Sequence, residues 1–224
     1  MNRYAKNGIL TKQEMILLKR AHICIVGCGG LGGYIMEMLS RVGVGKLTLI
    51  DGDVFDETNL NRQLLSLTHN LGQYKVEVAR ARIKSVNPEV KINIHKVYFN
   101  KENARDLIDD ATLVIDALDS IEIRKILQDV CETMDVPLIH GAIAGWYGQV
   151  TTIFPGDKTL DRLYTTNKDK GIETDLGNPS FTPATVASMQ VSEAIKVLIN
   201  KKELLRNKIL YIDLLDNEFH ILPI

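Results

Sequence analysis

The sequence predicts an α/β fold: a Rossmann-like, doubly wound, mainly parallel sheet with antiparallel strands at its C-terminal edge. Apolar runs typical of buried strands alternate with helical patterns over residues 21–140, the order of a parallel sheet covered by helices on both faces. A glycine cluster separates the first apolar run from the first of these helices. After His140 the pattern changes, and strand-like runs typical of antiparallel pairing follow.

Length and composition are those of an ordinary globular protein. The 224 residues are 45% hydrophobic and 25% charged, enough for one sizeable core. We expect a single domain over residues 1–224. Residues 1–20 form an N-terminal arm with a helix, and residues 21–140 form a nucleotide-binding α/β core. Residues 141–224 form an antiparallel extension that contains a crossover loop over 157–183.

Charge and hydropathy argue against several partners. The net charge of −1 implies no strongly basic face, so nucleic acid is not expected as the main partner. No apolar run is long enough to span a bilayer, so no membrane partner is expected. The first six residues lack the apolar core of a signal peptide, which favours a cytoplasmic location.

The first unit of the core reads strand, glycine turn, helix, strand and acid. Residues 22–26 form an apolar run, residues 34–42 a helical pattern, and residues 46–50 a second run that ends on Asp51. The three glycine positions of G-x-G-x-x-G are filled by Gly27, Gly29 and Gly32. These glycines permit a tight turn, close approach of a phosphate, and tight packing of the helix on the sheet.

This layout predicts a nucleotide site. The start of the helix offers N–H groups and partial positive charge to a phosphate. Asp51, at the end of the second strand, can accept hydrogen bonds from ribose hydroxyls. The alternative is a glycine-rich turn without a ligand, which the flanking strands and the acid make the weaker interpretation.

The other elements follow in chain order. Thr11 and Glu14 form a capping-box pattern that predicts a short helix before the first strand. In the core we expect helices over about 72–86, 101–108 (capped by Asn100) and 121–134, and strands over 90–94, 112–116 and 136–139. In the extension we expect an antiparallel strand over 149–154, a helix over 184–200 after the polar crossover loop, and strands over 208–215 and 218–222.

The three cysteines favour a structural interpretation. Cys24 and Cys131 fall inside a strand and a helix, where buried free thiols are expected. Cys28 lies in the glycine turn, where a lowered pKa is conceivable, but backbone groups dominate such turns. No C-x-x-C pair exists, so no zinc site of that kind is expected.

Polar residues gather at predicted carboxyl ends of strands, where open α/β sheets bind ligands. They are Asp51, Asp53, Asn59, Arg62, Gln63, Asp119 and Arg124, with Lys75 close behind. A reaction at ATP phosphorus uses two cations to neutralise phosphate charge and a carboxylate to hold Mg²⁺. A carboxylate that attacks phosphorus is already ionised at neutral pH, so acyl-adenylate formation needs no general base.

Each of these side chains also has an ordinary structural interpretation. Asp51 can cap the next turn and Asp119 the following helix. Arg62 can be a solvated loop residue, and Lys75 and Arg124 can be exposed charges on helices.

Five stretches carry a resemblance to a known family: Gly27–Gly32, Gly43–Gly45 with Leu49–Asp53, Asn59–Gln63, Gly72–Lys75 and Asp116–Asp119. On these the chain resembles the ThiF/MoeB/HesA family, ubiquitin-activating-enzyme-like proteins that adenylate sulfur carrier proteins, whose bacterial members serve molybdopterin and thiamine synthesis. The resemblance covers most of the chain, and the Asn-Leu-Asn-Arg-Gln block with the downstream lysine is more specific than the glycines.

The resemblance implies roles for the matching positions. ATP would be bound by Gly27, Gly29, Gly30, Gly32, Asp51, Asp53, Asn59, Arg62, Gln63, Lys75, Asp119 and Ser120. Arg62, Lys75 and Asp119 would be catalytic, and Asp119 would also serve Mg²⁺. Family members are homodimers in which an arginine of the N-terminal arm reaches the neighbour's phosphates. Lys6 stands at that position here, and a lysine keeps the charge but loses the bidentate fork.

The chain departs from the family in further ways. The usual zinc-binding cysteine pairs are missing, so no zinc is expected, and Ser120 replaces the usual asparagine. No cysteine lies in the crossover loop, where relatives with thioester or persulfide chemistry carry one. The expected function is therefore ATP-dependent adenylation of the C-terminal glycine of a small ubiquitin-like sulfur carrier ending in Gly-Gly, without a later covalent step on this chain.

Three alternatives remain open at this stage. A tRNA threonylcarbamoyladenosine dehydratase would share the fold, and Ala21–Cys24 and Asp119–Ser120 suit it, whereas Gln190 and the terminal hairpin suit the carrier-activating branch. A non-catalytic nucleotide-binding module and a nicotinamide-dependent oxidoreductase are the others. Neither explains why cations and a second acid accompany the glycine turn.

Overall fold

One eight-stranded mixed sheet runs through the computed structural model, which describes residues 3–165 and 173–224. The strand order is β3-β2-β1-β4-β5-β6-β7-β8. The strands are β1 (His22–Val26), β2 (Lys46–Ile50), β3 (Lys91–His95), β4 (Leu113–Asp116), β5 (Leu138–Ala144), β6 (Tyr147–Ile153), β7 (Lys208–Asp213) and β8 (Glu218–Pro223). Strands β1 to β5 pair in parallel, and β5 to β8 pair antiparallel, which confirms the predicted fold class.

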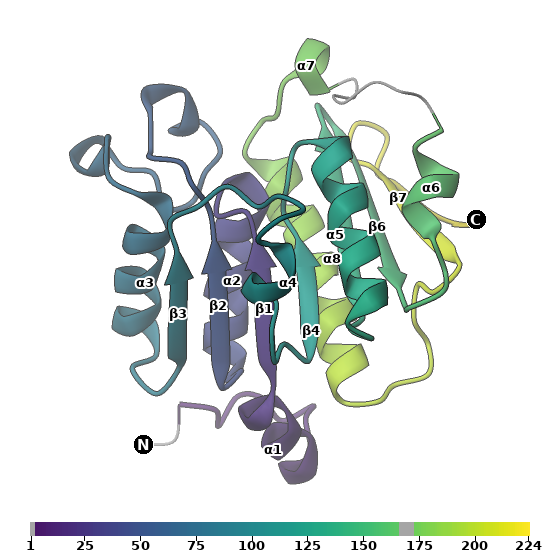
Figure 1. The fold of residues 1–224 in the computed structure, drawn as a ribbon, viewed down its shortest axis with the longest axis horizontal. Helices are drawn as coiled ribbons and strands as arrows, with labels where there is room; N and C mark the ends of the chain where they lie inside the picture. The colour runs from purple at the N-terminus through teal and green to yellow at the C-terminus, as the bar shows by residue number, and fades with distance from the viewer. Residues whose placement is uncertain (1–2, 166–172) are drawn as a thin grey trace.

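Helices cover the sheet in two layers (Figure 1). One layer consists of α2 (Gly30–Val42), α3 (Lys75–Val86) and α8 (Phe181–Leu198), and the other of α4 (Ala104–Leu107), α5 (Ile121–Thr133) and α6 (Thr159–Leu163). Strand β1 is buried on both sides: Ile23 and Ile25 pack with the first layer, and Cys24 and Val26 with the second. This explains why the strand is uniformly apolar from Ile23 to Val26.

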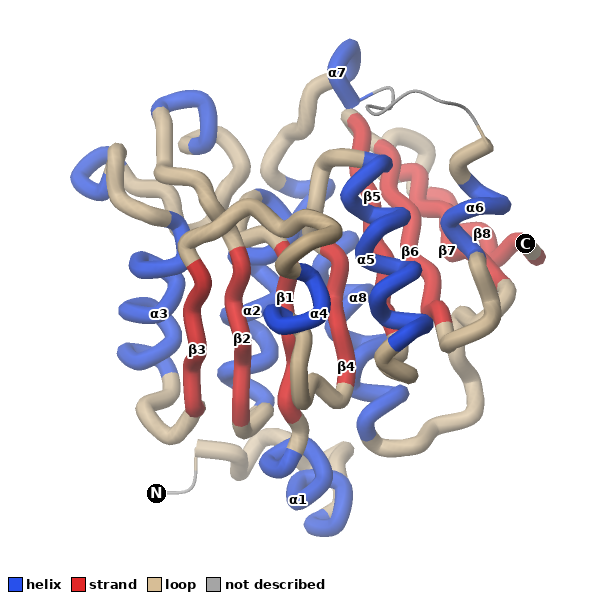
Figure 2. Tube along the Cα trace, viewed as in Figure 1, coloured by secondary structure: helices blue, strands red, loops and turns tan. Residues whose placement is uncertain are grey.

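The N-terminal arm lies at the end of the sheet where the parallel strands begin (Figure 2). Helix α1 (Lys12–Arg20) starts with the predicted capping box of Thr11 and Glu14. The arm is fixed because the side chain of Arg3 donates to the carbonyl of Val86, and Asn87 donates to the hydroxyl of Tyr4. The carboxyl ends of the strands point to the opposite end of the molecule.

Several boundaries differ from the sequence-based prediction. Helix α2 begins at Gly30, within the glycine cluster, and α8 begins at Phe181, so that Pro183 lies in its first turn, where proline is tolerated. The helix expected over 101–108 is limited to Ala104–Leu107. Strand β5 continues to Ala144, because the Gly145–Trp146 turn returns it directly into β6.

The crossover segment, residues 157–183, is less irregular than expected, because it contains α6 and α7 (Glu173–Leu176). Its middle, residues 166–172, lies outside the described residues. Helix α6 is fixed to α5 through Gln128, which accepts a hydrogen bond from the Leu160 amide and donates to Asp161. The start of the segment is therefore joined to the core.

All three cysteines are buried and free, as predicted. Burial raises the pKa of each thiol, including that of Cys28 in the glycine turn, which makes the thiolate inaccessible at neutral pH. Across the described residues, no helix combines the length and apolar character needed to cross a membrane.

Candidate active site

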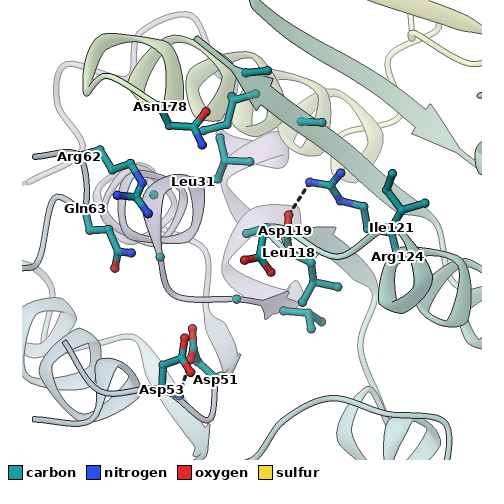
Figure 3. Close-up of a pocket in the computed structure, with 18 of the residues that line it drawn as sticks. Leu31, Asp51, Asp53, Arg62, Gln63, Leu118, Asp119, Ile121, Arg124 and Asn178 are labelled. Atoms are coloured by element: carbon teal, nitrogen blue, oxygen red, sulfur yellow. Dashed lines mark hydrogen bonds between the residues drawn. The ribbon is translucent and has the colours of Figure 1, made fainter. Parts of the chain in front are cut away.

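A cavity of about 990 Å³ lies at the carboxyl ends of the parallel strands. Its volume is that of sites for drug-sized ligands and cofactors. The sequence-predicted residues that line it are Gly27, Gly29, Gly30, Asp51, Asp53, Arg62, Gln63, Lys75, Asp119 and Arg124. Figure 3 shows them on different walls: Arg62 and Gln63 face Asp119 and Arg124 across the cavity, with Asp51 and Asp53 below.

The glycine turn is packed too tightly for larger residues at two of its positions. Gly27 has a φ of +100°, and a Cβ there would lie 2.4 Å from the carbonyl oxygen of Ala117. A Cβ on Gly32 would lie 2.0 Å from the carbonyl oxygen of Gly27, which explains why Gly32 is absent from the cavity lining. The third glycine therefore serves the packing of α2 on the turn.

Two neighbouring glycines of α2 offer a matched test of this packing. We expect Gly32→Ala to lower the free energy of unfolding by several kcal/mol, because backbone atoms cannot move aside as a flexible side chain does. A Cβ on Gly30 meets only Pro183, at 3.7 Å, so Gly30→Ala should leave stability equal or raise it by up to about 1 kcal/mol through helix propensity. Thermal unfolding without nucleotide measures both, and equal melting temperatures would contradict the packing argument.

Asp51 joins the glycine turn to the loop after β2. One carboxylate oxygen accepts a hydrogen bond from the Cys28 amide at 2.7 Å, and the other accepts from the Asp53 amide at 2.8 Å. Burial raises the pKa of Asp51, and Lys75 with the two amides opposes that rise. Asp51 therefore caps the turn that follows β2, which is its ordinary structural interpretation, and it also lines the cavity.

Lys75 points inward, although a surface position was the ordinary expectation for a helical lysine. Only 6% of the residue is exposed, and its Nζ donates to Asp53 at 2.8 Å. Partial burial opposes ionisation of Asp53, but hydrogen bonds from Lys75 and Tyr98 outweigh it, so the pKa of Asp53 is lowered. The site thus contains a buried ammonium beside an ionised carboxylate.

Tyr98 is a lining residue that the sequence interpretation missed. Its hydroxyl donates to Asp53 at 2.9 Å, and its ring lies against Gly52, where a Cβ would meet the ring at 2.9 Å. Tyr98 lies three residues after the end of β3. Its position beyond the carboxyl end of a parallel strand is the sequence feature that could have identified it as a lining residue.

Arg62 and Gln63 form the wall opposite Asp119. The Nη1 atom of Arg62 donates to the carbonyl of Thr58 and to the side chain of Asn61, which fixes the guanidinium at the cavity edge. The side-chain oxygens of Gln63 and of Asn178, another lining residue, are buried and make no hydrogen bond among the described residues. Buried polar atoms of this kind are commonly satisfied by a ligand or water.

Asp119 lies in the loop between β4 and α5, with its side chain exposed toward the cavity. It is not the helix cap, because the Oγ of Ser120 accepts from the Ile123 amide and takes that position. Arg124 is only 6% exposed, so its interpretation as an exposed helix charge is wrong. One of its terminal nitrogens donates to the carbonyl of Leu118, directly before Asp119.

Four predicted ligand residues do not line the cavity: Gly32, Asn59, Ser120 and Lys6. The side-chain oxygen of Asn59 accepts from the Asp56 amide, so this buried residue stabilises the loop that carries Arg62. Ser120 caps α5, as above. Lys6 is exposed in the N-terminal arm. Hydrogen bonds from Asn87 to Tyr4 and from Asn7 to the carbonyl of Val42 hold this arm at the end of the sheet opposite the carboxyl ends of the parallel strands (Figure 2).

Comparison with known proteins gives one consistent family. The model of the ThiF family matches residues 3–224. The chain is 32% identical to the SAMP-activating enzyme E1 of Haloferax volcanii, over 100% of this chain and 85% of that protein. It is 34% identical to the molybdopterin-synthase adenylyltransferase of Salmonella typhimurium, over 90% of this chain and 82% of that protein.

A solved structure shows the same fold. The crystal structure of Escherichia coli tRNA N6-threonylcarbamoyladenosine dehydratase in complex with AMP matches with a TM-score of 0.75 and 26% sequence identity. The match covers 89% of this chain and 95% of that one.

Proposed function

The chain belongs to the ThiF family, and on this basis we propose that it adenylates the C-terminal glycine carboxylate of a small ubiquitin-like sulfur carrier protein that ends in Gly-Gly. ATP is the second substrate and pyrophosphate the leaving product, in a route such as molybdopterin or thiamine synthesis. One observation carries the proposal: Arg62, Lys75 and Asp119 line the same cavity as the glycine turn.

The nucleotide would lie along the glycine turn. The amides at the start of α2 suit its phosphates, and Asp51 suits its ribose. Each oxygen of Asp51 accepts one backbone hydrogen bond, which leaves each with capacity for another from a ribose hydroxyl. Gln63, with a side-chain oxygen that lacks a partner among the described residues, is a further group for the nucleotide.

Adenylation needs charge neutralisation and alignment rather than a proton acceptor. An oxygen of the carrier's carboxylate forms a bond to the α-phosphorus, and the bond from that phosphorus to the pyrophosphate oxygen breaks. The carboxylate is ionised at neutral pH, so no base has to remove a proton. Arg62 and Lys75 would stabilise the charge on the transferring and leaving phosphates.

Mg²⁺ fits the residues at this site. Asp119 would hold the ion together with phosphate oxygens, and the bound ion would supply further neutralisation of phosphate charge. A magnesium site of this type needs only one or two carboxylates from the protein.

The buried cysteines imply that the acyl-adenylate is used directly. The chain has three cysteines, all of them buried with a raised pKa, so none is placed to receive the acyl group. The adenylated carrier would therefore be consumed by a sulfur nucleophile that another protein delivers.

We further propose a homodimer. The arm that carries Lys6 is held at the end of the sheet opposite the cavity, so a role of Lys6 at the phosphates requires a neighbouring copy. The segment around and after Arg62, residues 60–74, presents several large apolar side chains with 37–49% exposure: Leu60, Leu64, Leu67, Leu71 and Tyr74. A second copy covering this segment would remove that apolar surface from water.

One observation favours a second candidate substrate. A structural match above 25% identity is a tRNA-modifying dehydratase with AMP bound, so adenylation of a carboxylate on a modified tRNA base is the alternative. The net charge of −1 argues against binding of a polyanion such as tRNA, so the carrier protein remains the first choice.

The test is carrier-dependent pyrophosphate–ATP exchange with Mg²⁺. We expect exchange only when a carrier ending in Gly-Gly is present, and none with the same carrier lacking its last glycine. Exchange that needs an unmodified or modified tRNA instead of a carrier would support the alternative. ATP binding without exchange in any of these mixtures would contradict both.

A further inference from the structure

A buried polar network connects the start of the crossover segment to the loop that presents Asp119. His140 in β5 is fully buried and stands at its centre. Its Nδ1 lies 2.6 Å from a carboxylate oxygen of Asp116, and its Nε2 lies 3.1 Å from the hydroxyl of Tyr164. Tyr164 directly follows α6, and it also lines the cavity.

The hydrogen positions follow from the chemistry of these groups. A carboxylate can only accept, so the Nδ1 of His140 donates to Asp116. Burial lowers the pKa of His140, against the opposing effect of Asp116, and a neutral ring leaves Nε2 as an acceptor. The hydroxyl of Tyr164 therefore donates to His140 and accepts from the side-chain amide of Gln149, at 2.8 Å.

Two routes lead from Tyr164 to the peptide groups beside Asp119. Along the first, Asp116 accepts from His140 with one oxygen and from the Leu118 amide with the other, at 2.9 Å. Along the second, Arg124 reaches the Tyr164 hydroxyl at 3.4 Å with Nη1 and donates to the Leu118 carbonyl with Nη2. Both peptide groups of Leu118 are thus held by residues that contact this network, and Asp119 is the next residue.

We propose that Tyr164, acting through His140 and Asp116 and through Arg124, positions the loop 117–120 and with it Asp119. The anchoring of the crossover segment on the core then sets how efficiently the site adenylates its substrate. Tyr164 and His140 are positioning residues in this account. The Nε of Arg124 also lies 3.5 Å from a carboxylate oxygen of Asp116, so an ion pair joins the two routes, and a buried polar network of this kind restrains the groups it connects. The rate readout rests on the proposed function, whereas the structural readout does not.

Two substitutions separate the routes. Tyr164→Phe keeps the ring, which meets His140 edge-on with centroids 5.8 Å apart, and removes the hydroxyl, so both routes are broken. His140→Asn keeps a donor close to the position of Nδ1 for Asp116 and removes the acceptor for Tyr164, so only the first route is broken. Tyr34→Phe, in α2 and outside the cavity lining, is the matched control.

The first measurement is amide hydrogen exchange of the chain alone. We expect amide exchange across residues 117–120 to rise about five- to tenfold in Tyr164→Phe, because the restraint that the hydroxyl transmits to this loop through His140 and Arg124 is lost, with β1 and α2 unchanged. His140→Asn should give a smaller rise in the same residues, and Tyr34→Phe none. Unchanged exchange over 117–120 in Tyr164→Phe would overturn the proposal, even if His140→Asn fails to fold.

The second measurement is the rate of pyrophosphate–ATP exchange. Tyr164→Phe should lower kcat about five- to tenfold while the KM for ATP stays within about twofold, because the loop is loosened and the nucleotide turn is untouched. The double variant that combines Tyr164→Phe with His140→Asn should have the same kcat as Tyr164→Phe, because Tyr164→Phe already breaks both routes. Effects that simply add would overturn the proposal. If the wild-type chain shows no pyrophosphate–ATP exchange but the variants show the predicted changes in amide exchange, the proposed function is wrong and the positioning role of Tyr164 stands.

Discussion

Replacing Asp119 by asparagine should lower carrier-dependent pyrophosphate–ATP exchange by about 100- to 1,000-fold, the range found when one preorganised electrostatic group is removed from a reaction centre. Asparagine keeps the size of the side chain and removes the charge that would hold Mg²⁺ against the phosphates. The melting temperature should not change, because Asp119 is exposed and Ser120, not Asp119, caps α5.

Asp129→Asn is the matched control for this variant. Asp129 is another exposed aspartate, in α5 and outside the cavity lining, so its substitution should leave the exchange rate unaltered. If Asp119→Asn retains activity within about twofold of the wild type, Asp119 has no part in holding the metal or the reacting centre.

Replacing Arg62 by alanine is expected to have the second largest effect. The substitution removes a guanidinium from the cavity wall opposite Asp119, and exchange should fall about 100-fold. The loss should appear mainly in kcat if Arg62 stabilises charge on the leaving phosphates, with only a few-fold change in the dissociation constant of ATP. Steady-state exchange and calorimetric titration with ATP measure the two quantities.

Arg80→Ala serves as the control for the loss of a positive charge. Arg80 is exposed on α3 and lies outside the cavity lining, so exchange should be unaffected. Wild-type activity in Arg62→Ala, together with tighter binding of a reduced nicotinamide cofactor than of ATP, would instead favour the oxidoreductase interpretation.

The first half of the site could be predicted because its information is local. The apolar run of β1, the glycines and Asp51 all lie within one strand–helix–strand unit, and pairing of β1 with β2 brings the strand ends together. Arg62 and Asp119 follow the carboxyl ends of β2 and β4, and parallel strands end at the same edge of a sheet. The position of a residue relative to a strand end was therefore sufficient.

The remaining features depend on contacts between distant segments. The inward direction of Lys75 depends on its hydrogen bond to Asp53, a residue of another loop that Tyr98 also contacts. His140 meets Tyr164 only because β5 returns through β6 and α6 lies on α5. Asn59 matches a ligand position of the family, yet its side chain serves the backbone of its own loop, a choice that residue type alone cannot reveal.

The central claim is that this cavity joins AMP to a carrier's terminal carboxylate, and intact mass spectrometry of the carrier tests it directly. Carriers ending in Gly-Gly are incubated with the chain, ATP and Mg²⁺, with pyrophosphatase added to remove the leaving product. The account predicts a carrier that gains the mass of AMP less one water, as an acyl-adenylate does, and becomes a hydroxamate when hydroxylamine is added. Over the same reaction time the Arg62→Ala and Asp119→Asn reactions should give about 100-fold less adduct or lower still. ATP that is bound or cleaved while every such carrier stays unmodified would contradict the account.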